Sequence, residues 1–511
     1  MMKTDVLIIG GGITARRAAR IVAEKYSVTL VSDGAGASPY IHGLNVPLLD
    51  TDSTELFYKD TVESGKWQND PSLAEALTEG SRAVKAEFAA DFDKTDGGGY
   101  ELLKPLGSSV PRVASIGGRT GAGILRSLIA EKRYTELEST RALSLIKDGE
   151  KVVGAMLFDR KSRTHYPIFA DAVLIATGGF GGIFRFSTNS SDIGGDGCSM
   201  AYLAGAELVD MEFIQYEPTV AVSPKPLVGK SIITTMLFEG AVMRNARGER
   251  FMDEKVGKYA LSLGIAKEIA RGGGTENGGV YYDMTSVPKK MLKGKYKDYF
   301  TRYKNHGIDI GKTPVEIVPA PHTTMGGIRI DRECHTTVSG LFAAGEAAGG
   351  VHGANRLGGN AGLEVLVFGD IAGLAIVRFL DKKLDRGMDI SAFQAESAPD
   401  EVCDVSEERQ ELQSILDGAL GVERCESSLA AALPRLDMLI TSVSDKTRSF
   451  DAIRLRNDAV AAKLAVRAAL ERNESVGSHV RADFPLTGGE KYCIILKNES
   501  GDIAVKRQIL K

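Results

Sequence analysis

Glycine spacing near the start of the chain carries the clearest chemical signal. Gly10 and Gly12 follow a short apolar run, Ala15 comes three positions later, and a helical pattern begins there. The first glycine allows a tight turn, the second lets backbone approach a pyrophosphate, and the small third residue lets the helix pack on the strand. A polar pair then ends the second strand, where a side chain can meet a ribose. The sequence therefore predicts a dinucleotide site that includes Gly10, Gly11, Gly12, Ile13, Thr14, Ala15, Ser32 and Asp33.

Two further glycine-rich segments are expected at the same ligand. A buried strand over 172–176 ends in Thr177-Gly178-Gly179, and a third glycine cluster spans 345–362. Glycine clusters mark places where backbone approaches a ligand closely. Widely separated segments that close on one extended ligand suit FAD better than a nicotinamide cofactor.

The elements around these glycines form a βαβ beginning. A strand over 5–9, a helix over 13–25 and a strand over 28–32 are expected, because short apolar runs rich in β-branched residues are typical of buried parallel strands. Helices are expected over 71–93 and 120–133, and a hairpin over 152–158 and 164–169. Between about 216 and 318 the composition shifts towards lysine and tyrosine, which indicates an inserted second domain. Amphipathic spacing predicts helices over 407–419, 427–443 and 452–472, followed by a hairpin over 491–511.

Composition excludes several classes of protein. The 511 residues are 43% hydrophobic and 25% charged, ordinary for a globular enzyme of several domains. The net charge of -4 gives no basic footprint for nucleic acid. The five cysteines include no C-x-x-C pair, so no iron–sulfur, zinc or haem ligand set is predicted, and their scatter suits a reducing cytoplasm. The start of the chain lacks a secretory pattern, and the apolar stretch 363–380 contains three charges, which favours a core helix over membrane insertion.

Longer motifs carry a resemblance that covers nearly the whole chain. They comprise Ala176-Thr177-Gly178-Gly179, Thr188-Asn189, Gly195-Asp196-Gly197, Ala201-Tyr202 with Ala204-Gly205-Ala206, Asp210-Met211-Glu212-Phe213, Gly248-Glu249-Arg250-Phe251-Met252, His322 with Met325-Gly326-Gly327, Ala344-Gly345-Glu346, His352 to Asn360, and Gly477 to Pro485. In these motifs the chain resembles the flavoprotein subunits of succinate dehydrogenase and fumarate reductase, and L-aspartate oxidase. It is identified as a divergent member of that family.

The resemblance implies a fold. It is an α/β FAD-binding domain of the Rossmann type, discontinuous in sequence, with an inserted α+β capping domain and a C-terminal helical domain. We expect the FAD-binding domain over 1–215 and 326–390, the capping domain over 216–325, and the helical domain with its terminal hairpin over 391–511. Further cofactor-binding residues follow: Ser38, Ala176, Thr177, Gly178, Asn189, Asp196, Glu346, Arg356, Ala361, Gly362 and Leu363.

The resemblance also implies the chemistry, a hydride transfer between flavin N5 and a small carboxylate, for which the reacting atoms must lie within about 3–3.5 Å. Some members of the family bind FAD covalently through a histidine that follows a serine. Here Pro39 follows Ser38, and His42 is three residues out of register, so non-covalent FAD is expected.

The substrate motif is only partly present. Arg356 matches the family's carboxylate-binding arginine, whose planar fork suits a carboxylate, and His322 matches one of two substrate histidines. Glu217 replaces the second histidine, Ile233-Thr234 replace a Thr-Glu pair, and Lys258-Tyr259 replace Arg-Asp. A glutamate would repel a second carboxylate, so we expect an altered substrate whose far end carries an amine, a cation or a hydroxyl. Lys258 could serve as proton donor if burial lowered its pKa; its alternative is an exposed helix lysine.

Three functions follow, in order of preference. The first is a cytoplasmic FAD-dependent oxidoreductase of the fumarate reductase/succinate dehydrogenase type, with catalytic Arg356, His322, Glu217 and Lys258. The second is an amino-acid oxidase similar to L-aspartate oxidase, and the third an electron-relay flavoprotein subunit. Because the sequence contains no second redox centre, an iron–sulfur or other electron-transfer partner remains open.

Overall fold

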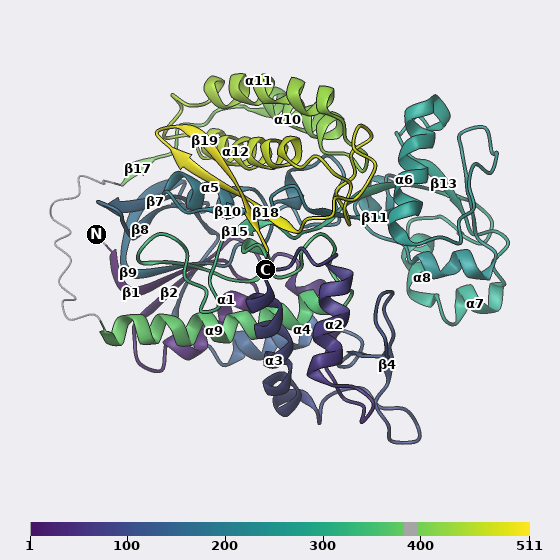
Figure 1. Cartoon of the computed structure of the whole chain (residues 1–511), viewed down its shortest axis with the longest axis horizontal. Helices are drawn as coiled ribbons and strands as arrows, with labels where there is room; N and C mark the ends of the chain where they lie inside the picture. Colours follow the sequence, from purple (N-terminus) through teal and green to yellow (C-terminus); the bar gives the residue numbers. More distant parts are fainter. Residues whose placement is uncertain (1, 383–396, 511) are drawn as a thin grey trace.

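The computed structural model describes residues 2–382 and 397–510. The expected domain boundary at 390/391 lies outside these residues. Figure 1 shows a central sheet with α9 and the N-terminal helices on one side and the C-terminal helices on the other; a smaller unit lies at one end. This layout is the expected α/β domain with an inserted α+β unit and a helical C-terminal part.

The main sheet combines parallel and antiparallel strands in the order β6-β2-β1-β9-β8-β7, with β16 and β17 also paired to β9. The parallel strands β2 and β16 and the second half of β1 are buried and apolar, as strands covered on both faces must be, whereas the edge strand β6 is polar and partly exposed. Their bounds are β1 Met2–Ile9, β2 Val28–Ser32, β6 Thr135–Glu138, β7 Thr140–Asp148, β8 Lys151–Asp159, β9 Thr164–Ile175, β16 Leu341–Ala343 and β17 Ala398–Pro399.

Strand β9 differs from the expectation. We expected two strands, over 164–169 and 172–176, but the chain stays extended from Thr164 to Ile175. Its first half pairs antiparallel with β8 and its second half parallel with β1. Asp171, which lay between the two expected strands, lies inside the strand and is 1% exposed. One continuous strand thus joins the hairpin to the parallel sheet and delivers Thr177-Gly178 to its carboxyl edge.

Helices α1 (Ile13–Val22) and α9 (Asn360–Lys382) pack closely on one face of the sheet. The contact depends on glycine, because a Cβ at Gly369 would lie 2.7 Å from Cβ of Arg17 and 3.0 Å from the Thr14 carbonyl oxygen. A Cβ at Gly373 would come similarly close to the backbone of Ala18. Within the described part of the chain no helix, α9 included, is long and apolar enough to cross a membrane.

The inserted unit has its own sheet, in the order β11-β14-β13-β12, and a separate apolar core. Figure 1 places it at one end of the molecule, joined through β11. Its elements are β11 Ile214–Ala221, β12 Val242–Arg244, α6 Lys258–Glu268, β13 Val280–Asp283, α7 Lys289–Lys293, α8 Lys297–Lys304 and β14 Val315–Thr324. Strands β11 and β14 form the connection to the main domain.

The C-terminal part contains the three expected helices, α10 Ser406–Ala419, α11 Glu426–Ser442 and α12 Phe450–Glu471, and the terminal hairpin of β18 Tyr492–Glu499 and β19 Asp502–Ile509. The hairpin does not stand alone, because β18 pairs with β10. The other elements are β3 Leu44–Asn45, α2 Thr54–Ser64, α3 Pro71–Phe88, β4 Leu102–Leu103, β5 Val113–Ala114, α4 Thr120–Ala130, α5 Asp196–Leu203, β10 Leu208–Val209 and β15 Gly327–Ile328.

The close approach of α1 and α9 makes a stability prediction. Gly369→Ala places a methyl group in a contact with no room, and overpacking of this kind costs about 1–3 kcal/mol. We expect the thermal unfolding midpoint to fall by a few degrees. Gly418→Ala in α10 is the matched control, because a Cβ there meets nothing within 4 Å and alanine favours a helix. Equal midpoints for the two variants would contradict the packing account.

Candidate active site

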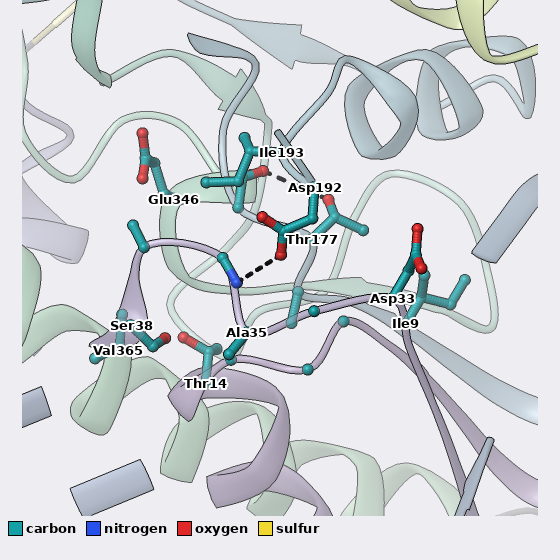
Figure 2. Close-up of a pocket in the computed structure, with 18 of the residues that line it drawn as sticks. Ile9, Thr14, Asp33, Ala35, Ser38, Thr177, Asp192, Ile193, Glu346 and Val365 are labelled. Atoms are coloured by element: carbon teal, nitrogen blue, oxygen red, sulfur yellow. Dashed lines mark hydrogen bonds between the residues drawn. The ribbon is translucent and has the colours of Figure 1, made fainter. Parts of the chain in front are cut away.

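A cavity lies at the carboxyl edge of the parallel strands, where β1, β2 and β9 end. It encloses about 1070 Å³, open solvent at its mouth included. Figure 2 shows its lining, with Thr14 and Ser38 on one side and Thr177 and Ile193 on another. The glycine turn after β1, the turn after β9 and the start of α9 all contribute, so segments far apart in sequence meet here.

The glycine turn leaves the positive end of α1 open to this cavity. Gly10 has φ +132°, and a Cβ there would lie 2.2 Å from the Ala176 carbonyl oxygen. Gly12 caps α1 without a side-chain acceptor, and the Ile13 N–H donates to Ser38 Oγ at 3.0 Å. The other first-turn N–H groups are available to an anion, which the helix dipole favours.

The structure brings most of the predicted cofactor residues to this cavity. Those that line it are Gly10, Gly11, Gly12, Thr14, Asp33, Ser38, Ala176, Thr177, Gly178, Asp196, Glu346 and Ala361. Seven others do not form its wall: Ile13, Ala15, Ser32, Asn189, Arg356, Gly362 and Leu363. Ala15 and Leu363 are fully buried in the helix packing, and Ser32 donates its hydroxyl to Glu136.

Sequence reasoning missed the segment 34–37 and the residues that brace it. Arg141, at the start of β7, bonds the Asp196 carboxylate and the Asp192 carbonyl oxygen. The Gly36 N–H donates to the Asp192 carboxylate at 2.9 Å, the contact that Figure 2 draws. Asp33 forms ion pairs with Arg141 and Arg160. A lone arginine at the start of a strand has no local signal, whereas the glycines of 34–36 could have been noticed.

These features fit a flavin dinucleotide. An open helix N-terminus suits the pyrophosphate, and a Cβ at Gly178 (φ +78°) would meet only Ile193, at 4.0 Å, so backbone can lie close to a ligand there. When bound, FAD supplies the exchange of a hydride. The residues named above would hold it.

Arg356 lies beside this cavity, and no carboxylate of the described residues forms an ion pair with its guanidinium. It donates to Gln215 Oε1 at 3.1 Å and weakly to the Leu357 carbonyl oxygen at 3.5 Å, and Nε is buried without an acceptor. Gln215 Nε2 in turn donates to Asn355 Oδ1 and the Arg356 carbonyl oxygen. Burial lowers the pKa of Arg356, although Glu346, Glu364 and Glu217 counteract this shift. A guanidinium so placed is arranged to receive an anion.

His322 stands near Arg356 as a neutral imidazole. Burial, with added repulsion from Arg356 and Lys258, lowers its pKa to about 3. Nδ1 lies 2.8 Å from Thr188 Oγ1, a shorter contact than the 3.3 Å from that hydroxyl to the Pro321 carbonyl oxygen. When Thr188 donates to Nδ1, Nε2 carries the hydrogen and can donate it to a carboxylate oxygen.

Glu217 and Lys258 form an ion pair, with Nζ 2.7 Å from Oε2. The Glu217 side chain is 9% exposed and that of Lys258, the first residue of α6, is 57% exposed. Lys258 therefore lacks the burial that its expected role as proton donor required. Glu217 is likewise not an isolated negative charge, so the expected repulsion of a second carboxylate is largely neutralised by the adjacent ammonium.

The fold and the cavity define a flavin-binding oxidoreductase. Comparisons agree with this class. Residues 5–361 match the FAD binding domain, and residues 409–502 match the fumarate reductase flavoprotein C-terminal domain.

The chain is 33% identical to a fumarate reductase (CoM/CoB) subunit of Methanothermobacter marburgensis, over 98% of this chain and 97% of that protein. It is 32% identical to L-aspartate oxidase of Bacillus subtilis, over 95% and 92%. The Mycobacterium smegmatis Sdh1 structure with UQ1 superposes with a TM-score of 0.90 at 29% identity, over 99% of this chain and 94% of that one. The chain belongs to the fumarate reductase, succinate dehydrogenase and L-aspartate oxidase family of FAD-dependent oxidoreductases.

The residues after the second strand predict how FAD is attached. Pro39 offers no nucleophile after Ser38, and the His42 backbone is fixed by a bond from Thr120 Oγ1 to its carbonyl oxygen. We expect acid precipitation of the purified yellow protein to release all flavin into the supernatant. Flavin absorbance that stays with the washed precipitate would show a covalent link.

Proposed function

We propose that this protein transfers a hydride between FAD and a small carboxylate, at the carbon–carbon bond next to the carboxyl group. Arg356 binds the carboxylate, and His322 donates a hydrogen bond to it. The preferred substrate is an unsaturated acid or its saturated counterpart. The physiological direction depends on the redox partner.

The Arg356 guanidinium is the observation that carries this proposal. Its hydrogen bonds go to neutral oxygens, and Nε has no acceptor, so its charge favours a bound anion. His322 precedes Thr323, which lines the FAD cavity. A carboxylate held by these two side chains would therefore lie beside the cofactor, where hydride transfer requires it.

The Glu217–Lys258 pair lies at the same site, since the charge of Lys258 also acts on His322. As a pair these residues have no net charge and offer both a donor and an acceptor. This environment suits a polar group at the far end of the substrate better than it suits a full charge. It gives less support to an amino-acid oxidase, because Lys258 already occupies the carboxylate that would bind the amine.

Electrons must also enter or leave the flavin. The sequence contains no cysteine pair of the kind that holds a cluster, so we propose a separate electron-transfer partner, either an iron–sulfur protein or a soluble carrier. A protein that only relayed electrons would not need Arg356 to bind a substrate, so we favour an enzyme over a pure electron-relay subunit.

The test follows the reduced flavin. Anaerobically reduced enzyme is mixed with fumarate, crotonate and other small enoates, and flavin reoxidation is recorded by stopped flow. We expect at least one enoate to reoxidise the flavin. Arg356→Gln should lower the second-order rate constant about 100-fold, because hydrogen bonds to a charged group are worth about 3 kcal/mol. The exposed Arg126→Gln is the matched control.

A second variant probes the far end of the substrate. Glu217→Gln leaves the Lys258 ammonium without its counter-charge, so fumarate should gain several-fold over crotonate. Lys255→Gln, an exposed lysine three positions before Lys258, should change neither rate. No response to any carboxylate in wild type would refute the proposal, and peroxide release with L-aspartate would favour the oxidase instead.

A further inference from the structure

Two glutamates are among the residues that line the FAD cavity. Glu346 follows β16, and Glu364 lies in the second turn of α9. Figure 2 shows Glu346 at the opposite end of the view from Asp33. A carboxylate beside a redox cofactor is sensitive to the charge of that cofactor, because the cavity is poorly screened from it.

Glu364 is held in place by His352. Its Oε2 lies 2.9 Å from Nε2 of His352, and both side chains are at most 4% exposed. Among the described residues His352 Nδ1 has no hydrogen-bond partner, so the ring can donate from Nε2 to the Glu364 carboxylate. The charge of Glu364 acts on Glu346.

Glu346 has no such partner. Its Oε1 accepts from the Thr324 N–H at 3.0 Å and weakly from the Thr324 hydroxyl. Burial raises the pKa of Glu346 to about 7, the Glu364 charge adds to the rise, and the Thr324 bonds and Arg356 oppose it. From α5, the Cys198 thiol also faces it, and burial raises the pKa of that thiol to about 12.

We propose that Glu346, beside the His352–Glu364 pair, is a proton-binding site that takes up one proton when the bound flavin is reduced. Reduction adds two electrons and one proton to the isoalloxazine, which gains one negative charge. The Glu346 carboxylate then takes a second proton from the buffered bulk solvent, where hydronium or a buffer acid supplies it, and Glu346 becomes a carboxylic acid. This inference depends on bound FAD, and the identity of the substrate does not enter it.

The direction of the pH dependence follows from the charges. Above about pH 7 Glu346 is ionised beside oxidised flavin, and the added negative charge favours its protonation. Glu346 therefore takes up a proton on flavin reduction only within a pH range, called the window here, that begins near pH 7. Below this window Glu346 is protonated in both redox states and takes up nothing.

The test is spectroelectrochemical titration of the holoenzyme flavin from pH 5.5 to 9. For a two-electron couple each proton contributes about 30 mV per pH unit to the slope of the midpoint potential. Above pH 7, the midpoint potential of wild type should fall more steeply with pH than that of Glu346→Gln, by about 30 mV per pH unit, the contribution of one proton. The exposed Glu499→Gln is the control and should match wild type.

A second variant should shift the pH range over which Glu346 takes up a proton. Glu364→Gln removes a negative charge that raises the Glu346 pKa, so the extra slope should begin at lower pH. Identical slopes for wild type and Glu346→Gln, with flavin bound and unfolding midpoints equal, would overturn the proposal. If Glu346→Gln does not retain flavin, the Glu364→Gln variant decides. The proposal is overturned if the extra slope begins at the same pH in Glu364→Gln as in wild type. The titration uses mediators and no substrate, so its outcome is independent of the enoate test.

Discussion

The site depends on one electrostatic constraint, a largely buried guanidinium whose hydrogen bonds reach only neutral oxygens. Gln215 fixes Arg356 through a reciprocal set of bonds, accepting from the guanidinium and donating to its backbone carbonyl oxygen. A buried charge without an ion-pair partner is costly. Under the proposed function an anionic ligand would relieve that cost, and Arg356 would bind an acid before any chemistry begins.

The fold forms the cofactor cavity by bringing segments that are distant in sequence to one edge of the main sheet. The turn after β1, the turn after β9 and the start of α9 line the same cavity. Close contact between α1 and α9, through Gly369 and Gly373, holds two of these segments together. The last residues of strand β14 include His322, on which the charge of Arg356 acts, and Thr323, which lines the cavity, so the inserted unit reaches the cofactor domain here.

The sequence predicted the features that rest on local backbone chemistry or on long motifs. Gly10 and Gly178 could be found because their positive φ angles favour glycine, and Gly12 because a Cβ there would lie 2.8 Å from Ser38 Oγ. The terminal helices could be found because their apolar spacing is regular. It could not predict that Lys258 is half-exposed and paired with Glu217, because that contact joins side chains 41 positions apart. The continuous β9 was missed because it changes partner from β8 to β1 partway along, which leaves no mark in the sequence. Arg141 was missed because a bracing role leaves no local pattern.

A crystal structure of the FAD-bound enzyme soaked with the enoate that reoxidises the flavin would test the central claim most directly. The account predicts density for a carboxylate paired with the Arg356 guanidinium, and a substrate carbon within about 3.5 Å of flavin N5. A substrate bound elsewhere, with the guanidinium facing only Gln215 and solvent, would contradict it.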